Sequence, residues 1–277
     1  MTATLAVSLS ATLLALPHST AASVPTPTAR FGAASHVAVA DRSAASGLDH
    51  KATVLENWPC AGCVVVLPNN YRPGQPTPIL VALHGDEGVS SLITDAWAPV
   101  TTKKNVILFA PQCPTDEGCR LQNGSAGFTN SWWGWFQYSR GYDDNLIARE
   151  VDRIAARYAL DPAREYLVGW SGGADYLGWY APRHAARFAA VAYVAGGTPY
   201  DAACPTQKLA AYFLMGSADF RYLSGQPAQV RELLARCGDP TKWVVLAGAD
   251  HQGTITSLSY GQRASSVLAW LLHHRLR

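Results

Sequence analysis

Tyr166-Leu167-Val168-Gly169-Trp170-Ser171-Gly172-Gly173-Ala174 is the stretch that decides the fold of this chain. An apolar run with strand character ends beside a serine, two glycines follow directly, and the residues up to Ala186 predict a helix. A strand that turns so sharply into a helix strains the backbone of the serine and lifts its hydroxyl clear of the sheet. Glycines are expected on both sides of the serine, because side chains would collide where the strand and the helix nearly touch.

Residues Gly169 to Gly173 match the pattern Gly-x-Ser-x-Gly, the nucleophile elbow of α/β-hydrolases. A pattern of only five residues can occur by chance, so the interpretation depends on the elements predicted on either side of it. Residues 165–170 predict the strand that must come before the serine, and residues 172–186 predict the helix that must come after it. A plain strand-turn-helix junction is the alternative. We take Ser171 as the candidate nucleophile.

Short apolar runs alternate with helical segments along the rest of the chain. Strands are expected at residues 64–67, 79–83, 106–110, 165–170, 191–194, 209–215 and 243–246. Helices are expected at residues 143–158, 172–186, 226–236 and 260–273. This alternation predicts an α/β fold with a mostly parallel central sheet and helices on both faces. With the elbow, it predicts the α/β-hydrolase fold.

The composition predicts one globular domain without an affinity for nucleic acid. Of the 277 residues, 48% are hydrophobic and 15% are charged, which suits a single α/β domain with a sizeable core. The formal net charge is +2. Because no basic stripe accompanies this small charge, nucleic acid is not an expected partner.

The first residues predict a targeting segment. Residues 5–16 are mainly apolar but too few to span a bilayer, and Thr20-Ala21-Ala22 offers a cleavage site, although no Lys or Arg precedes the apolar run. We therefore expect a signal peptide at residues 1–22, a flexible Ala/Ser/Thr/Pro-rich linker at 23–48 and a catalytic domain at 49–277. The protein is expected outside the cell or in the periplasm, with no membrane span.

Six cysteines are typical of an oxidising compartment. We expect Cys113 to pair with Cys119, which closes one loop, and Cys204 with Cys237, which joins two later connections. Cys60 and Cys63 then form the remaining pair. A redox or zinc site is the alternative for these two, but it needs a second pair or a helix N-terminus, so we expect a structural disulfide and no metal.

A serine hydroxyl attacks an ester when a base takes its proton and an acid orients that base. In α/β-hydrolases these residues follow the chain order Ser, acid, His, each after a strand. His251 lies in that order, in an expected loop after strand 243–246, and is the candidate base. The other seven histidines do not fit that order. His18, His36 and His50 lie before the domain or at its start, and His84 precedes the serine. His184, His273 and His274 lie in or beside expected helices.

Asp219 follows the expected strand 209–215 and is the candidate acid. A helix N-cap is the alternative for this residue. Glu232 falls in the middle of an expected helix, and Asp239 lies in a turn beside Pro240. Asp250 is adjacent to the base and could hardly reach its far ring nitrogen.

An oxyanion hole needs two backbone N–H groups where negative charge develops on the substrate. Gly172, directly after the nucleophile, is expected to supply one of them. The run His84-Gly85-Asp86-Glu87-Gly88 follows strand 79–83 and is expected to supply the other from the N–H of Asp86, with Glu87 as the alternative. His84 is then structural. A simple strand-ending turn would explain His-Gly equally well by itself.

Residues 112–142 form the longest irregular stretch, and it contains Trp132-Trp133-Gly134-Trp135-Phe136-Gln137-Tyr138. Aromatic side chains at this density would not remain in water, so the stretch is expected to pack on its own aromatics, to line a substrate site, or both. Trp132 and Trp133, with Trp170 beside the nucleophile, are the candidate substrate wall.

Four parts of the chain together resemble secreted esterases of the polyhydroxybutyrate depolymerase and feruloyl esterase type. They are the His84-Gly85 loop, the helix that opens at Asp143-Asp144, the run from Tyr158 to Gly173, and Gly216 to Asp219. The resemblance covers about residues 60–260 and is most specific in the run before the elbow. It implies a Ser-His-Asp triad that needs no metal or cofactor and cleaves esters outside the cell. Gly172 departs from the alanine common in depolymerases.

The expected function is that of a secreted serine esterase. It would hydrolyse small or oligomeric carboxylic esters, with hydroxyalkanoate or aromatic acyl groups, through an acyl-enzyme. An acyltransferase on the same fold is one alternative and would need an acceptor subsite. A non-catalytic binding protein is another, and it would not need every triad position to be filled.

Overall fold

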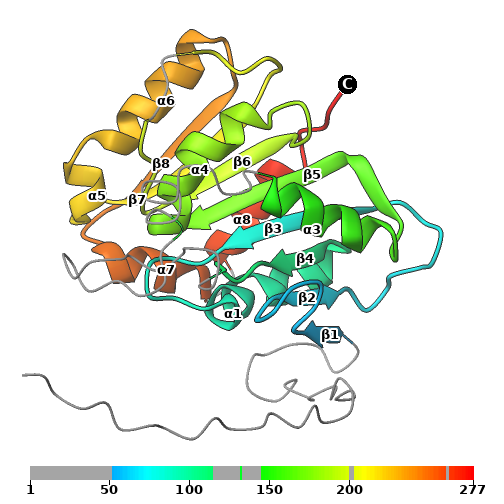
Figure 1. Ribbon diagram of the computed structural model, residues 1–277. Coiled ribbons are helices and arrows are strands. Elements are labelled where there is room, and N and C mark those ends of the chain that lie inside the picture. The colour runs from blue at the N-terminus through cyan, green and yellow to red at the C-terminus, as the bar shows by residue number, and fades with distance from the viewer. Residues whose placement is uncertain (1–51, 115–131, 133–144, 200–202, 260–261) are drawn as a thin grey trace, which may run out of the picture. The chain divides into compact units, whose positions relative to one another are not determined.

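The structure is built on one central sheet (Figure 1). The computed structural model describes residues 52–114, 132, 145–199, 203–259 and 262–277. Within them, eight strands lie in the order β1-β2-β4-β3-β5-β6-β7-β8. They are β1 (Thr53–Glu56), β2 (Val64–Leu67), β3 (Thr77–Leu83), β4 (Ile107–Ala110), β5 (Leu160–Trp170), β6 (Ala190–Val194), β7 (Ala210–Gly216) and β8 (Thr241–Leu246).

The sheet is mostly parallel, as the sequence predicts. Strands β3 to β8 run parallel to one another, while β1 and β2 add an antiparallel edge. Because parallel strands end at the same edge, the segments that follow β3, β5, β7 and β8 emerge side by side. These are the segments in which the sequence places the candidate site residues.

Helices cover both faces of the sheet (Figure 1). One face carries α3 (Leu146–Ala155), α4 (Gly172–Arg183) and α6 (Gln226–Arg236), and the other carries α1 (Ser90–Thr101), α7 (His251–Ser259) and α8 (Gln262–Leu271). Two short helices, η1 (Thr102–Lys104) and α5 (Phe220–Leu223), complete the described helices.

The strands β2, β3, β4, β6 and β7 are almost unbroken apolar runs because both of their faces are buried. In β3, Ile79, Val81 and Leu83 pack toward the first set of helices, and Leu80 and Ala82 pack toward the second. All seven residues of this strand are buried. The alternation divides the core into two apolar layers, one on each side of the sheet.

Five described elements were not predicted (β1, α1, η1, α5 and α7), and His251 was predicted to lie in a loop. It is the first residue of α7. Both α7, which contains Gly253 and several Ser and Thr residues, and α1, which contains Pro99 and has no side-chain N-cap, lack ordinary helix signals. The strand β1 has only four residues and lies at the edge of the sheet.

Two of the expected disulfides are confirmed. Cys60 is bonded to Cys63 and Cys204 to Cys237. Cys113 is also disulfide-bonded, while Cys119, its expected partner, lies outside the described residues. The expected signal peptide (1–22) and linker (23–48) lie outside them too. In the part of the chain that the structure covers, no helix has the length and apolar character needed to cross a bilayer.

Candidate active site

Ser171 stands at the turn between β5 and α4 in a strained backbone conformation, with φ 52° and ψ −122°. A positive φ is costly for a residue with a side chain, so its neighbours must enforce it. The Ser171 N–H donates to the carbonyl of Val194 at 2.9 Å. A Cβ on Gly169 would lie 2.5 Å from the carbonyl carbon of Gly173, so only glycine lets the strand and helix approach this closely.

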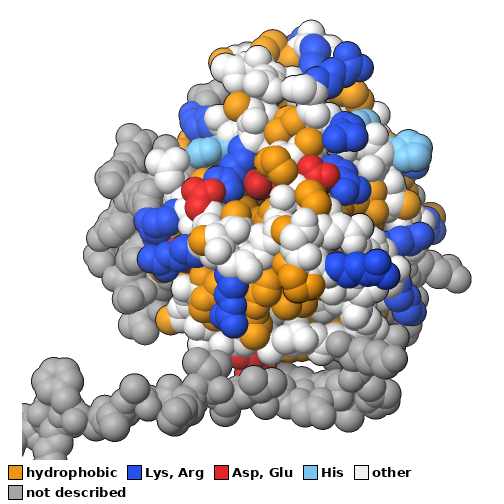
Figure 2. All heavy atoms as spheres, turned by 90° about the vertical axis from the view of Figure 1, so that its right-hand side faces the viewer, with side chains coloured by type: hydrophobic (Ala, Val, Ile, Leu, Met, Phe, Trp, Pro, Cys, Tyr) orange, Lys and Arg blue, Asp and Glu red, His pale blue; other side chains and the backbone are white. Residues whose placement is uncertain are grey.

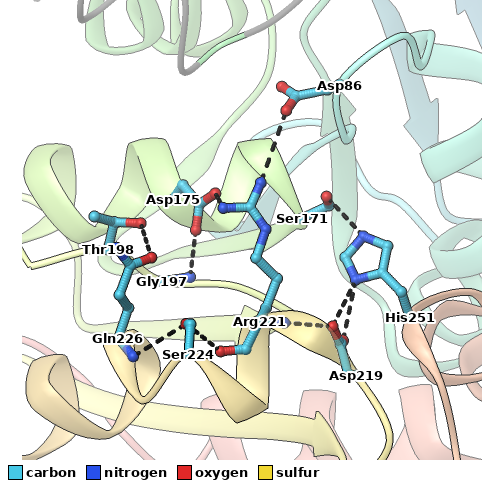
Figure 3. A network of polar contacts seen from close by, with 10 residues as sticks. All are labelled: Asp86, Ser171, Asp175, Gly197, Thr198, Asp219, Arg221, Ser224, Gln226 and His251. Atoms are coloured by element: carbon cyan, nitrogen blue, oxygen red, sulfur yellow. Dashed lines mark hydrogen bonds and ion pairs between the residues drawn. The ribbon is translucent and has the colours of Figure 1, made fainter. Parts of the chain in front are cut away.

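Three side chains from distant parts of the chain meet at this turn (Figure 3). The Oγ of Ser171 lies 2.8 Å from the Nε2 of His251. The Nδ1 of the same imidazole lies 3.0 Å from both carboxylate oxygens of Asp219. Ser171 is 6% exposed and Asp219 is fully buried, whereas the side chain of His251 between them is 23% exposed, so water is excluded most strongly at Asp219.

Asp219 is both a partner of His251 and a helix N-cap. Its Oδ1 accepts the backbone N–H of Arg221 at 2.8 Å and thereby caps α5. The helix N-cap is thus observed, and the hydrogen bonds to His251 leave Asp219 as the candidate acid. The other acids have separate partners: Asp250 accepts the N–H of Gly253 in the first turn of α7, and Asp239 accepts that of Leu209.

Two aromatic rings contact the imidazole of His251. The indole of Trp170 is stacked on it, with ring centroids 5.6 Å apart, and the ring of Phe220 lies 4.8 Å away. Phe220 had no sequence signal, because it follows Asp219 in a short helix without periodicity. These contacts restrict the tilt of the imidazole.

The candidate wall residues differ in their surroundings. Trp170 is half-buried. Trp132 is fully buried and packs against His84 and Tyr176, at ring-centroid distances of 5.7 and 5.5 Å. These contacts support a packing role for Trp132 behind the His84 loop. Trp133 lies outside the described residues.

His84 is buried and neutral. Its Nε2 accepts the N–H of Cys113 at 3.2 Å, so its proton is on Nδ1, which donates to the carbonyl of Gly85 at 2.7 Å. Burial lowers the pKa of His84 to about 4, against a smaller opposing effect of the Gly85 hydrogen bond. The bond to Cys113 ties the loop after β3 to the loop after β4, and the bond to Gly85 fixes the orientation of the imidazole.

The candidate oxyanion loop lies against the serine. Leu83 pairs with Gly169 in the sheet, so Gly85 comes beside Ser171, and a Cβ on Gly85 would lie 3.1 Å from that of the serine. The carbonyl of Gly85 also accepts the N–H of Gly88 at 3.0 Å, which closes the loop. The carboxylate of Asp86 sits directly over Gly172, where a Cβ would otherwise be.

Several proteins of known structure that share this arrangement of strands and helices are esterases and related hydrolases. A protein described as a thermostable esterase superposes with a TM-score of 0.57 and 18% identity, over 81% of this chain and 63% of that one. A ferulic acid esterase from Anaeromyces mucronatus gives a TM-score of 0.54 and 17% identity, over 72% of this chain and 81% of its own. The chain has the α/β-hydrolase fold.

One curated protein also resembles this chain in sequence. It is the poly(3-hydroxyalkanoate) depolymerase C of Paucimonas lemoignei, 29% identical over 143 residues, which are 50% of this chain. The matched part spans 31% of the length of that depolymerase. No protein-family model matches the chain. The resemblance predicted from the elbow and its flanking motifs is thus confirmed.

A cavity of about 210 Å³, lined by Trp170 and Gln252 beside two of the candidate site residues, lies between α1 and α7. Its lining is apolar at Leu92, Ile93, Trp170 and Ile255 and includes the polar side chain of His84. A larger cavity, of about 460 Å³, lies far from the serine, at the edge where β6, β7 and β8 begin. That edge is on the side turned toward the viewer in Figure 2, where basic side chains are interspersed with apolar and acidic ones.

Arg221 is a site residue that had no sequence signal. Its guanidinium lies between the carboxylates of Asp175 and Asp86 (Figure 3). An arginine two residues after an acid forms no recognised motif, and only the folded loops bring it to α4. Among the described residues, no three His, Cys, Asp or Glu side chains gather as they would around a metal ion.

Proposed function

We propose that this chain is a serine esterase that hydrolyses carboxylic esters through an acyl-enzyme. The observation that carries the proposal is the continuous set of hydrogen bonds from Ser171 Oγ through the imidazole of His251 to Asp219, at 2.8 and 3.0 Å. A hydroxyl, an imidazole and a buried carboxylate in this order can activate the hydroxyl as a nucleophile.

The reaction has two halves. In the first, Ser171 Oγ attacks the ester carbonyl carbon, Nε2 of His251 takes the hydroxyl proton, and the same proton then goes to the departing alkoxide. In the second, water attacks the acyl-enzyme, His251 takes a proton from the water and returns it to Ser171. Asp219 holds the proton on Nδ1, so that Nε2 is free to accept, and stabilises the imidazolium that forms.

We assign the stabilisation of the oxyanion to the backbone N–H groups of Gly172 and Asp86. Gly172 is the first residue of α4, so the positive end of the helix dipole adds to its N–H. The N–H of Asp86 belongs to the peptide whose carbonyl, that of Gly85, accepts from His84 and Gly88. Because N–H and C=O point in opposite directions in a trans peptide, those two bonds fix the direction of the Asp86 N–H.

The substrates we propose are hydroxyalkanoate or aromatic acyl esters, small or oligomeric. The similar curated protein is described as a poly(3-hydroxyalkanoate) depolymerase, and one similar structure is that of a ferulic acid esterase. The cavity of about 210 Å³ between α1 and α7 supports an apolar group of modest size, with Trp170 as one wall. Two disulfides support a location outside the cell or in the periplasm.

The proposal is tested by labelling and turnover. The wild-type protein should react with a fluorophosphonate probe at Ser171 and release alcohol from p-nitrophenyl esters, methyl ferulate or a hydroxybutyrate oligomer. Ser171→Ala should fold, lose labelling and lose several orders of magnitude in kcat. A wild-type protein that neither labels nor hydrolyses any of these esters would contradict the proposal and favour a binding protein. Transfer of the acyl group to an added alcohol in preference to water would indicate an acyltransferase.

A further inference from the structure

Arg221 joins three parts of the candidate site (Figure 3). Its backbone N–H donates to Asp219 at 2.8 Å, its Nη1 lies 2.5 Å from Asp175 Oδ2, and its Nη2 lies 3.9 Å from Asp86 Oδ2. Asp219 follows β7, Asp175 is in the first turn of α4, and Asp86 is in the loop after β3. One side chain thus contacts the element that follows the serine and the loop of the candidate oxyanion donor, while its backbone holds the candidate acid.

The structure assigns to Arg221 the role of a positioning residue. Its guanidinium holds the Asp86 loop and helix α4 together, so that the N–H groups of Asp86 and Gly172 face one site beside Ser171. This inference rests on the proposed esterase function. It differs from the triad chemistry, because the guanidinium acts through Asp175 and Asp86 and not on the reacting atoms.

The charges of the site require such a cation. Asp175 is 1% exposed, and its Oδ1 accepts the N–H of Gly197 at 2.8 Å. Burial raises the pKa of this carboxyl, whereas Arg221 and the Gly197 hydrogen bond oppose the rise. Without the guanidinium, Asp175 would be a buried group with no compensating charge on Oδ2, which is a strongly unfavourable state.

Asp86 adds a second carboxylate beside the same helix N-terminus. Its side chain is 11% exposed, and its oxygens occupy the space where a Cβ on Gly172 would be. A negative charge there opposes the negative charge that develops on the ester oxygen. Arg221, with a side chain that is 22% exposed, is close enough to offset it. A guanidinium between the two carboxylates, in contact with Asp175 and 3.9 Å from Asp86, therefore orients the two segments and offsets their negative charge.

The arrangement also explains why glycine stands at position 172. A methyl group at this position and the carboxylate of Asp86 cannot occupy the same space. Gly172, Asp86 and Arg221 thus form one unit: the glycine admits the carboxylate, and the carboxylate is held by the arginine.

A double-mutant cycle tests the inference. Arg221→Met keeps the length of the side chain and removes its charge, so kcat for a p-nitrophenyl ester should fall about 10- to 100-fold, with KM changed less than about threefold. In this background Asp86→Asn should restore kcat several-fold, because it removes the carboxylate charge that Arg221 offsets in the wild type and keeps the backbone N–H. Arg236→Met, an exposed position at the end of α6, is the matched control and should leave kcat unchanged.

Two results would overturn the inference while leaving the esterase function intact. One is a kcat of Arg221→Met within twofold of wild type. The other is a double variant whose loss is the sum of the two single losses. If Arg221→Met does not fold, the cycle is run with Arg221→Lys, whose single ammonium cannot bridge both carboxylates, and the same two criteria apply. A wild-type protein without esterase activity or probe labelling would instead refute the proposed function, and this inference with it.

Discussion

The backbone of Ser171 is held in its strained conformation by its neighbours on three sides. Strain of this kind costs about 1–3 kcal/mol and persists only where the surroundings over-determine it. Here Val194 binds the serine N–H, Gly169 lets α4 approach β5, and a Cβ on Gly196 would lie 2.6 Å from the serine carbonyl oxygen. Glycines are therefore needed around the serine for reasons of space, independent of any catalytic role.

Gly172→Ala is expected to damage the site by steric conflict with Asp86. The new methyl group would displace the Asp86 loop, so kcat should fall at least about tenfold and the free energy of unfolding by about 1–3 kcal/mol. Ester turnover and urea unfolding measure the two effects. Adding Asp86→Ala should recover much of the lost stability, because it removes the carboxylate that conflicts with the new methyl group. A single variant with wild-type turnover would show that the Asp86 loop moves without cost.

At the scale of elements, the predictable parts are those with a strong local pattern. The strand β2 and the helix α6 have the bounds that the apolar pattern predicts, because continuous apolar runs and the 3.6-residue period are read directly from sequence. The helices α1 and α7 escaped prediction, since tertiary packing overrides their weak helix signals. The chain order Ser, Asp, His was enough to find three residues that meet, but the contacts of Arg221 depend on loop geometry that no local pattern encodes.

The cavity between α1 and α7 predicts a size limit for the substrate. Ile255→Trp should fill much of its volume of about 210 Å³, so KM for p-nitrophenyl esters of long acyl chains should rise about tenfold or more, while the acetate ester is hardly affected. A series of esters from acetate to decanoate measures this split. Ala235→Trp, at an exposed position on α6, is the control for the added indole. An equal rise in KM along the whole series would argue against this cavity as the subsite.

The Cys204–Cys237 disulfide joins the segment before β7 to the end of α6. It spans 33 residues, so by loop-closure entropy the double substitution Cys204→Ala/Cys237→Ala should lower the free energy of unfolding by about 3–4 kcal/mol. Urea unfolding without reductant measures the loss. The double variant should retain its activity when folded, because the disulfide connects elements away from Ser171. A loss below 1 kcal/mol would mean that the unfolded state is already restricted.

At the scale of the whole molecule, the parallel sheet brings together residues that are far apart in the sequence. Ser171 and His251 are 80 positions apart, yet their atoms are 2.8 Å apart, because β5 and β8 deliver their following segments to one edge. The same edge receives the His84 loop from β3. A site assembled this way exists only in the folded protein, so its activity should disappear together with the global fold.

That global fold should depend on pH through His84. The pKa of this imidazole is about 4 in the folded protein, lowered by burial, and 6.5 is its ordinary value. Above pH 6.5 the imidazole is neutral in both states and adds no pH dependence. Between pH 6.5 and 4 the unfolded chain binds a proton that the folded protein does not, so stability falls as pH falls. Below pH 4 both states are protonated and the loss is complete.

A comparison of the wild type with His84→Asn separates the contribution of His84 to the pH dependence of stability from the contributions of other titrating groups. The variant should be less stable than wild type at pH 8, because the bonds to Gly85 and Cys113 are not both replaced. From pH 6.5 to 4 the difference in unfolding free energy should narrow by about 3 kcal/mol, since a pKa unit corresponds to 1.36 kcal/mol. Urea unfolding at several pH values measures it. A difference that stays constant over this range would mean that His84 takes up its proton as readily in the folded protein as in the unfolded chain.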